Sequence, residues 1–381
     1  MKRKLVFLLL VFISALTPEA RPQVNAPVGT DAPSPQKIVT FGCLLPLTGR
    51  YNVLGQKALK GILAAAGSGT AGTQYRVIVK DFGDSDRLLA SSLDELLKTP
   101  DLSFIIGPVP SKYIRTVSQK VNSRKVPSVV FPVSEGEGPG GPYIIKYYYP
   151  LEEQVRVLSE YAVRALGVKR FAVLYPGTPF GGMLKDLFAV AAAENGGKLV
   201  YEGSYDPESR DISKEIDWIR SAAPDAVFIP DGAASSAELI LRLKREGKLR
   251  DVLFLGPSTW NSPLFLNLIG HEIDGFVYRA IFTDVFFYGD ADWGEFSESA
   301  RGNTDKKPDI FGYQVYRAVK LMLSLGIEPG GGETTADMLK PVKNDPSYNI
   351  VVDENGSYRV SPRYRILSVS GGELIDIINV K

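Results

Sequence analysis

The feature that most constrains the fold is a repeated alternation of two kinds of segment that begins at Lys37. A short apolar run is followed, again and again, by a helix-length segment whose apolar residues lie three and four positions apart. Neighbouring parallel strands must be joined by a long crossover, which is usually a helix. The alternation therefore predicts an α/β fold with parallel central sheets and crossover helices.

The apolar runs and the amphipathic segments set the expected element boundaries. We expect strands at Ile38–Leu45, Tyr75–Asp81, Phe104–Gly107, Ser128–Phe131, Phe171–Tyr175, Lys198–Tyr205, Ala226–Pro230 and Val252–Leu255. We expect helices at Gln56–Ala66, Leu88–Lys98, Lys112–Asn122, Leu151–Leu166, Met183–Asn195, Ile212–Ala222, Ser235–Glu246 and Asp309–Ser324. Glycines follow several of these helices, where a left-handed residue commonly ends a helix.

The length and the order of elements indicate two lobes. A single hydrophobic core stops growing at about 250–300 residues, and this chain has 381. The element order runs through one unit and then restarts. We expect lobe 1 to contain residues 37–149 and 278–350, and lobe 2 to contain residues 150–277 and 351–381. In this division the apolar segment from 278 to 282 returns to the first lobe, and short strands flank a turn at Asp353–Gly356.

The amino terminus has the pattern of an export signal. Three basic residues, Lys2–Lys4, precede an apolar stretch from Leu5 to Leu16, which is shorter than the roughly 20 residues that cross a bilayer. We expect residues 1–20 to be a signal peptide, residues 21–36 to be a linker, and the mature protein to lie in the periplasm. A permanent membrane anchor is the alternative. No cysteine stands directly after the apolar stretch, where lipid attachment would require one, so a lipoprotein is not expected.

The charge balance and the rare residues limit the kinds of chemistry. The chain has 44 Lys and Arg against 43 Asp and Glu, so no overall field favours nucleic acid. Cys43 is the sole cysteine and is expected to be buried packing, with no disulfide. His271 is the sole histidine and is expected in a loop. We therefore expect no catalytic residues, no metal site and no cofactor.

Two loops join expected strands to expected helices and are candidate ligand-binding segments. Leu47–Gly55 and Gly107–Ser111 both follow buried strands, and ligands of open α/β sheets bind at the carboxyl ends of strands. The first loop lacks the Gly-Lys-Ser/Thr ending of a phosphate loop. Ser111 is expected either to cap the helix or to donate its hydroxyl to an anion. The glycine-rich tract Glu135–Pro142 is expected to be a surface loop.

Seven segments, in order along the chain, resemble the type I periplasmic solute-binding proteins of branched-chain amino acid and amide ABC transporters, the Leu/Ile/Val-binding protein-like family. They are PLTGRYNVLGQKALKGI, IIGPVPSKY, VPSVVFPVS, RFAVLYPGTPFGG, YDPESRDISKEIDWIRSAAPDAVFIPDG, FLGPSTW and VVDENGSYRV. The resemblance implies two Rossmann-like lobes joined by three crossovers and a ligand cleft between them. It also implies delivery of a small molecule to an ABC permease of the inner membrane, and the protein is expected to be a monomer.

The resemblance also implies a set of ligand-binding residues. Ser111, beside Pro110, matches the hydroxyl residue that holds the ligand carboxylate in amino-acid-binding members. Val133, Ser134 and Glu135 fall in a loop that supplies further contacts, although Glu135 stands where such members have threonine. The remaining matched or neighbouring positions are Tyr51, Phe180, Asp231, Ser235 and Trp260.

The acidic residue that would pair with a ligand ammonium is replaced by Ser235 or a neighbour, and Asp231 is the nearest carboxylate. An ammonium buried without a counter-charge costs several kcal/mol. Unless Asp231 or Glu135 takes that role, the ligand is not a standard α-amino acid. Tyr51, Phe180 and Trp260 would then offer apolar faces to an aromatic or aliphatic acid.

Two other functions remain open from the sequence. The opening segment also resembles periplasmic activators of cell-wall synthases, which use the same fold to bind a penicillin-binding protein. The helical repeat domain and lipid anchor of those activators are not recognised here. An enzyme is the third possibility, but paired carboxylates such as Asp84 and Asp86 are expected to be solvated surface charge.

Overall fold

The computed structural model describes residues 37–69, 72–107, 110–132, 138–209, 211–249, 251–273, 280–301, 309–330, 332–353, 356–370 and 372–377. The chain divides into two compact units. Unit 1 contains the chain through Tyr148 together with Tyr288–Ser361. Unit 2 contains Tyr149–Phe287 and the chain from Pro362 onward. The expected signal peptide and linker lie outside the described residues.

Unit 1 is built around a seven-stranded sheet in the order β11-β12-β5-β4-β3-β1-β2. Its strands are β1 (Lys37–Leu45), β2 (Thr73–Asp81), β3 (Leu102–Ile106), β4 (Ser128–Val130), β5 (Ile144–Tyr147), β11 (Tyr348–Val352) and β12 (Tyr358–Pro362). Its helices are α1 (Asn52–Gly67), α2 (Asp86–Leu96), η1 (Ser111–Tyr113), α3 (Ile114–Arg124), α9 (Ala291–Arg301), α10 (Ile310–Ser324), α11 (Thr335–Leu339) and η3 (Lys340–Val342). Five neighbouring pairs in this sheet are parallel: β2 with β1, β1 with β3, β3 with β4, β4 with β5, and β5 with β12.

Unit 2 has a second seven-stranded sheet in the order β14-β13-β10-β9-β8-β6-β7. Its strands are β6 (Arg170–Pro176), β7 (Lys198–Tyr205), β8 (Ala226–Phe228), β9 (Leu253–Gly256), β10 (Ala280–Asp284), β13 (Arg365–Ser370) and β14 (Glu373–Asp376). Its helices are α4 (Leu151–Arg164), α5 (Pro179–Glu194), α6 (Ser213–Ala222), α7 (Ala233–Arg245), η2 (Ser258–Trp260) and α8 (Pro263–Ile273). Only the pairs made by β13 are antiparallel among the pairings described for this unit.

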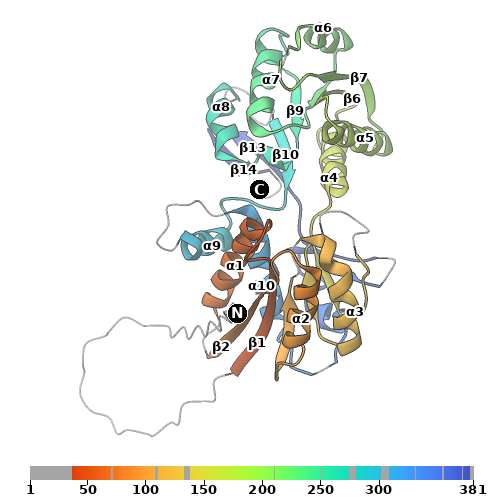
Figure 1. Ribbon diagram of the computed structural model, residues 1–381. Coiled ribbons are helices and arrows are strands. Elements are labelled where there is room, and N and C mark those ends of the chain that lie inside the picture. The colour runs from red at the N-terminus through yellow and green to blue at the C-terminus, as the bar shows by residue number, and fades with distance from the viewer. Residues whose placement is uncertain are drawn as a thin grey trace, which may run out of the picture. The chain divides into compact units, whose positions relative to one another are not determined.

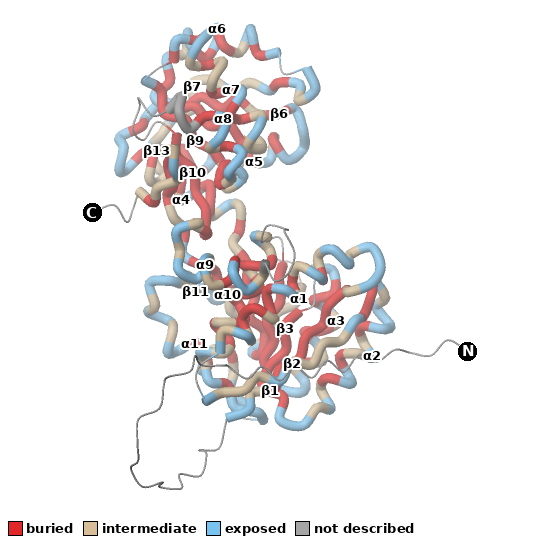
Figure 2. The backbone as a smooth tube through the Cα atoms, turned by 90° about the vertical axis from the view of Figure 1, so that its left-hand side faces the viewer, coloured by how far each residue is buried: buried red, intermediate tan, exposed pale blue. Residues whose placement is uncertain are grey.

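Helices cover both faces of each sheet, as Figure 1 shows separately for the two units. In unit 2, alternate residues of one strand enter different cores. Phe171 and Val173 of β6 pack with α4 and α5, while Ala172 and Leu174 pack with α6, α7 and α8. The central strands β6, β8, β9 and β10 are therefore buried on both faces (Figure 2), which explains why they are continuous apolar runs in the sequence.

The expected lobe boundaries differ from the structure at two of the three passages. The first passage, between Tyr148 and Tyr149, lies beside the expected one. The second lies between Phe287 and Tyr288, because the segment expected to return to lobe 1 forms β10, which pairs with β9 and β13 of unit 2. The third lies after Ser361, because β12 pairs with β5.

Helices α1 and α10 of unit 1 approach so closely that one glycine is required between them. A Cβ atom added to Gly61 would lie 2.1 Å from the carbonyl oxygen of Gly312 and 3.0 Å from the backbone nitrogen of Tyr316. Backbone atoms cannot rotate away as a side chain can. The contact between α1 and α10 therefore depends on the absence of a side chain at position 61.

We predict that Gly61→Ala destabilises unit 1 by about 1–3 kcal/mol, because the added methyl overpacks the helix contact. Gly294→Ala in the exposed part of α9 is the matched control, since a Cβ there meets nothing within 4 Å. The control should be neutral or stabilising by up to about 1 kcal/mol through helix propensity. Calorimetric unfolding of both variants tests this, and equal behaviour would contradict the close packing.

Candidate functional site

The strand order of unit 1 creates one point where two strand-to-helix loops diverge. The chain leaves β1 toward β2 on one side and then crosses to β3 on the other side. Because β1, β2 and β3 are parallel, their carboxyl ends share one edge of the sheet. Tyr51 follows β1, and Pro110 and Ser111 follow β3. These predicted site residues therefore lie at the switch point, where open α/β sheets bind ligands.

Unit 2 has the same arrangement around β6. The chain runs from β6 outward to β7 and then crosses to β8 on the opposite side. Phe180 is the second residue of α5, which follows β6. Asp231 follows β8, and Ser235 lies in the first turn of α7. The sequence thus placed three candidate residues at the second switch point.

A glycine lets the helix after β1 in unit 1, and the helix after β6 in unit 2, begin directly against the end of the preceding strand. A Cβ on Gly55 would lie 2.3 Å from the carbonyl oxygen of Pro46, and a Cβ on Gly181 would lie 2.3 Å from the carbonyl oxygen of Pro176. The two units thus use the same local device at equivalent edges. It brings the start of α1, and equally of α5, close to the loop expected to hold a ligand.

Asp81 holds the loop after β1 in place. Its Oδ1 accepts hydrogen bonds from the backbone N–H groups of Leu47 (2.8 Å), Thr48 (3.3 Å) and Gly83 (2.9 Å), and its Oδ2 accepts from the Thr48 hydroxyl (2.8 Å). Backbone donors that the strand ladder no longer satisfies are therefore used by one carboxylate. The apolar run from Tyr75 predicts Asp81 at the end of a strand and gives no sign of this role.

Ser111 does not cap a helix through its side chain. It is the first residue of η1, whose N-cap is Pro110, and no side-chain cap bond is made there or at the start of α3. Within the described residues the half-buried Ser111 hydroxyl has no hydrogen-bond partner. Of the two roles considered from the sequence, capping is excluded, and donation to a ligand stays a prediction.

Asp231 is already hydrogen-bonded to its own unit. Its Oδ2 accepts from the Tyr205 hydroxyl at the end of β7, and its Oδ1 accepts from the backbone N–H of Gly232 at 2.6 Å. Its backbone carbonyl accepts from the Thr259 hydroxyl at 2.8 Å. Asp231 therefore links the ends of β7, β8 and β9, and no pattern in the sequence indicates this structural role.

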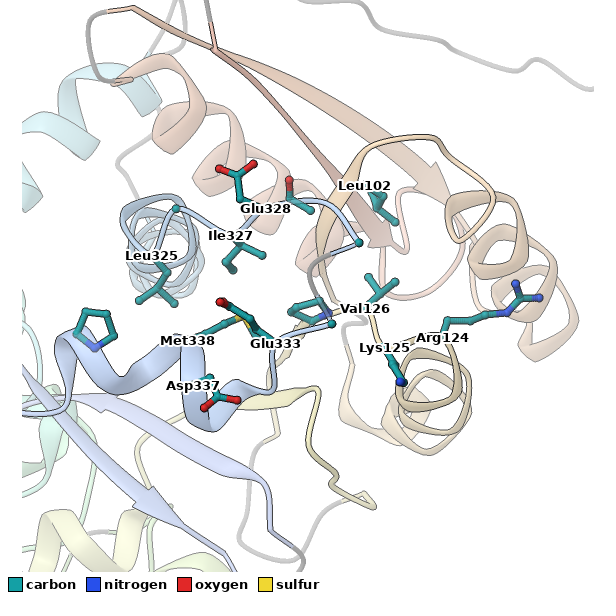
Figure 3. Close-up of a pocket in the computed structure, with 16 residues that line it drawn as sticks. Leu102, Arg124, Lys125, Val126, Leu325, Ile327, Glu328, Glu333, Asp337 and Met338 are labelled. Atoms are coloured by element: carbon teal, nitrogen blue, oxygen red, sulfur yellow. The ribbon is translucent and has the colours of Figure 1, made fainter.

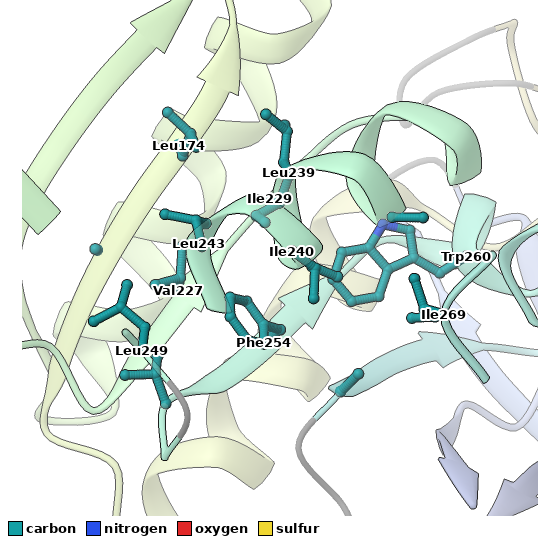
Figure 4. Close-up of a cluster of buried hydrophobic side chains, with 14 of the residues drawn as sticks. Leu174, Val227, Ile229, Leu239, Ile240, Leu243, Leu249, Phe254, Trp260 and Ile269 are labelled. Carbon is teal, nitrogen blue, oxygen red and sulfur yellow. The ribbon is translucent and has the colours of Figure 1, made fainter. Parts of the chain in front are cut away.

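The two aromatic candidates of unit 2 occupy opposite environments. Phe180 is 55% exposed, whereas Trp260 is fully buried. The Trp260 ring stacks on Phe265 with centroids 4.7 Å apart and packs in the cluster shown in Figure 4. Phe180 thus keeps an accessible apolar face, while Trp260 has no face available in this arrangement. A tryptophan beside a strand end looks the same in sequence whether it points outward or inward.

Three candidates, Val133, Ser134 and Glu135, lie outside the described residues. The expectation that His271 lies in a loop was wrong, because α8 continues through it to Ile273. Cys43 is buried as predicted, and burial raises the pKa of its thiol. Within the described ranges, no three His, Cys, Asp or Glu side chains are grouped to hold a metal ion, and no helix is long and apolar enough to span a membrane.

A buried carboxyl at the end of β10 was missed by the sequence analysis. Asp284 is 3% exposed, and burial raises its pKa to about 7 despite several hydrogen bonds. Its Oδ2 accepts from the Asn261 amide at 2.8 Å, and its Oδ1 accepts from the backbone N–H of Val285 at 2.7 Å. The residue lies three positions before the passage into unit 1 at Phe287.

A cavity of about 390 Å³ in unit 1 lies away from the candidate site. Its lining includes Leu102 at the start of β3, Val126 before β4, and Ile327, Glu333 and Met338 beyond α10 (Figure 3). These positions are at the amino ends of the parallel strands. No residue predicted from the sequence to bind ligand lines this cavity.

Comparison with known proteins decides the family. A model described as periplasmic binding protein matches residues 38–359. The chain belongs to the periplasmic binding protein family. Membership implies a periplasmic location, and the two mostly parallel sheets with flanking helices are the type I fold of this family. The resemblance identified from the seven sequence segments is confirmed.

The relatives of this periplasmic binding protein are distant. Leu/Ile/Val-binding protein homolog 3 of Brucella melitensis is 22% identical over 232 residues, which are 59% of this chain and 62% of that protein. A putative branched-chain amino acid ABC transporter structure from Rhodospirillum rubrum has a TM-score of 0.71 and 18% identity, covering 89% of this chain and 99% of that one. A solute-binding protein from R. palustris in complex with 4-hydroxybenzoate has a TM-score of 0.51 and 16% identity, covering 89% and 95%.

We predict that Asp284 makes stability depend on pH. The folded chain holds its proton up to about pH 7, whereas an exposed aspartate releases it near pH 4. The folded state binds more protons in this window, so stability should fall as pH rises from about 4 to about 7, by at most about 1.4 kcal/mol per pH unit. Above about pH 7 the contribution of Asp284 to stability should no longer change, because the group is then ionised in both the folded and the unfolded state.

Asp284→Asn should remove this slope, because asparagine does not titrate. Asp186→Asn, on the exposed surface of unit 2, should leave the slope unchanged. Melting temperatures measured from pH 4 to pH 8 compare the three proteins. A slope that survives in Asp284→Asn would show that another group is responsible.

Proposed function

We propose that this chain is the substrate-binding protein of an ABC transporter and that it binds an amino acid, an amide or a related small carboxylate. The observation that carries the proposal is the position of the candidate residues. Residues selected from sequence segments fall at the switch points of two separate sheets, one in each unit. Ligands of this kind of sheet bind at that edge.

Each unit contributes a different chemistry in this proposal. Unit 1 offers the Ser111 hydroxyl, which has no partner within the described residues, and the half-buried ring of Tyr51. Unit 2 offers the exposed ring of Phe180 and the side chains of Asp231 and Ser235. Val133, Ser134 and Glu135 are proposed as further contacts. Trp260 supports the site from within the core of unit 2 and is not proposed as a contact.

Binding would act through hinge closure. A ligand that contacts both carboxyl edges stabilises the arrangement in which both contacts are made, and the equilibrium shifts by the difference in affinity. The three passages of the chain, at Tyr148, Phe287 and Ser361, are the candidate hinges. We further propose that the protein is exported by its amino-terminal segment, acts as a monomer without changing its ligand chemically, and delivers that ligand to an inner-membrane permease.

A thermal shift screen combined with small-angle scattering tests the proposal. Amino acids, their amides and aromatic acids are the probes. At a ligand concentration of about 100 times Kd, the free energy of unfolding should rise by about 2.7 kcal/mol. The same compound should reduce the radius of gyration. The receptor function would be rejected if no compound raised the melting temperature and scattering showed no compaction.

A further inference from the structure

The switch point of unit 1 carries two cations around one aromatic ring. The guanidinium carbon of Arg50 lies 4.7 Å from the centroid of the Tyr51 ring, and the ammonium nitrogen of Lys112 lies 5.3 Å from the same centroid. Arg50 comes from the loop after β1, and Lys112 comes from η1 after β3. The two cations are separated widely in sequence, and the adjacency of β1 and β3 brings them together.

A buried ring helps to fix the position of Lys112. Its ammonium nitrogen lies 4.3 Å from the centroid of the Tyr113 ring. Tyr113 is 1% exposed and packs edge-to-face on Phe82 with centroids 5.0 Å apart. A cation over an aromatic face is attracted by the ring quadrupole, so the core of unit 1 holds this exposed charge near Tyr51.

The two cations are only partly neutralised. Arg50 Nε lies 3.9 Å from Asp84 Oδ2, and both side chains are about half exposed or more, so the pair is weak. Lys112 has no carboxylate partner within the described residues. An excess of positive charge therefore remains beside the Tyr51 ring.

We propose that Arg50 and Lys112, held around Tyr51, bind a carboxylate of the ligand, and that the ligand is an organic acid without an ammonium group on the adjacent carbon. An α-amino acid bound by its carboxylate here would bring its own ammonium next to two cations. The ligand ammonium and these two cations carry like charges, so they repel one another when the ligand is bound. Aromatic and aliphatic carboxylates lack that penalty.

The carboxylate of unit 2 fits the same conclusion. The oxygens of Asp231 already accept hydrogen bonds from the Tyr205 hydroxyl and from the Gly232 N–H. A ligand ammonium at Asp231 would have to share these oxygens with the existing bonds from Tyr205 and Gly232. The inference rests on the proposed receptor function and narrows its ligand class.

Matched pairs of probes test the inference by titration calorimetry on the purified protein. The pairs are 3-phenylpropanoate against phenylalanine, 4-methylpentanoate against leucine, and 4-hydroxybenzoate against 4-hydroxybenzamide. The first compound of each pair is the one expected to bind. In at least one pair it should bind at least about 10-fold more tightly than the second compound, which has an added ammonium or lacks the carboxylate. Lys112→Gln and Arg50→Gln should each weaken that acid about 10- to 100-fold, as loss of a hydrogen bond to a charged group does.

Two control variants make the same charge changes at the other edge of unit 1. Lys98 is exposed and lies just beyond the carboxyl end of α2, and Arg124 is exposed and lies in the last turn of α3. Both Lys98→Gln and Arg124→Gln should retain the affinity of the wild type. Unfolding of each variant without ligand checks that it is folded.

The outcomes separate this inference from the receptor function. If amino acids bind the wild type as tightly as their matched acids, or if Lys112→Gln and Arg50→Gln both keep the affinity, the anion site is wrong while the receptor function stands. If no compound in the wider screen binds the wild type, the receptor function falls, and the anion site falls with it.

Discussion

The structure depends on one constraint, which is that parallel strands buried on both faces must be joined by helices. This arrangement collects the carboxyl ends of the strands at one edge of each sheet. At the points beside β1 and β6, successive crossovers run in opposite directions, which is where open α/β sheets bind their ligands. Gly55 and Gly181 then let a helix start against the strand-end carbonyl in each unit. The candidate site is therefore a consequence of topology before any specific side chain is considered.

Side-chain chemistry then differs between the two edges. Unit 1 places Arg50 and Lys112 around Tyr51, and Arg50 is only weakly paired with Asp84. Unit 2 places Asp231 at its edge, but the carboxylate of this residue already accepts hydrogen bonds from Tyr205 at the end of β7 and from the backbone N–H of Gly232. In the proposed site, selectivity therefore comes from a few loop residues on a fold that is shared with proteins of very different sequence.

Elements with strong apolar periodicity could be predicted from the sequence. Features that depend on a contact between residues far apart in the chain could not. Strand β7 was predicted at Lys198–Tyr205, the residues that form it. Strand β5 was missed because Lys146 interrupts a short apolar run, and its charge is satisfied by Asp353 at 2.9 Å from a remote segment. The meeting of Arg50 with Lys112 was also missed. In sequence, Arg50 is a loop residue and Lys112 is the first residue of an expected helix, and only the pairing of β3 with β1 makes them neighbours.

The central claim is that one ligand contacts the carboxyl edges of both sheets. Hydrogen–deuterium exchange with and without the ligand found by screening tests it most directly. The account predicts slower exchange in the loops at 46–52 and 110–114 of unit 1 and, with the same ligand, at 177–182 and 230–236 of unit 2. Protection confined to one unit, or centred on the cavity formed by Val126, Ile327 and Met338, would contradict it.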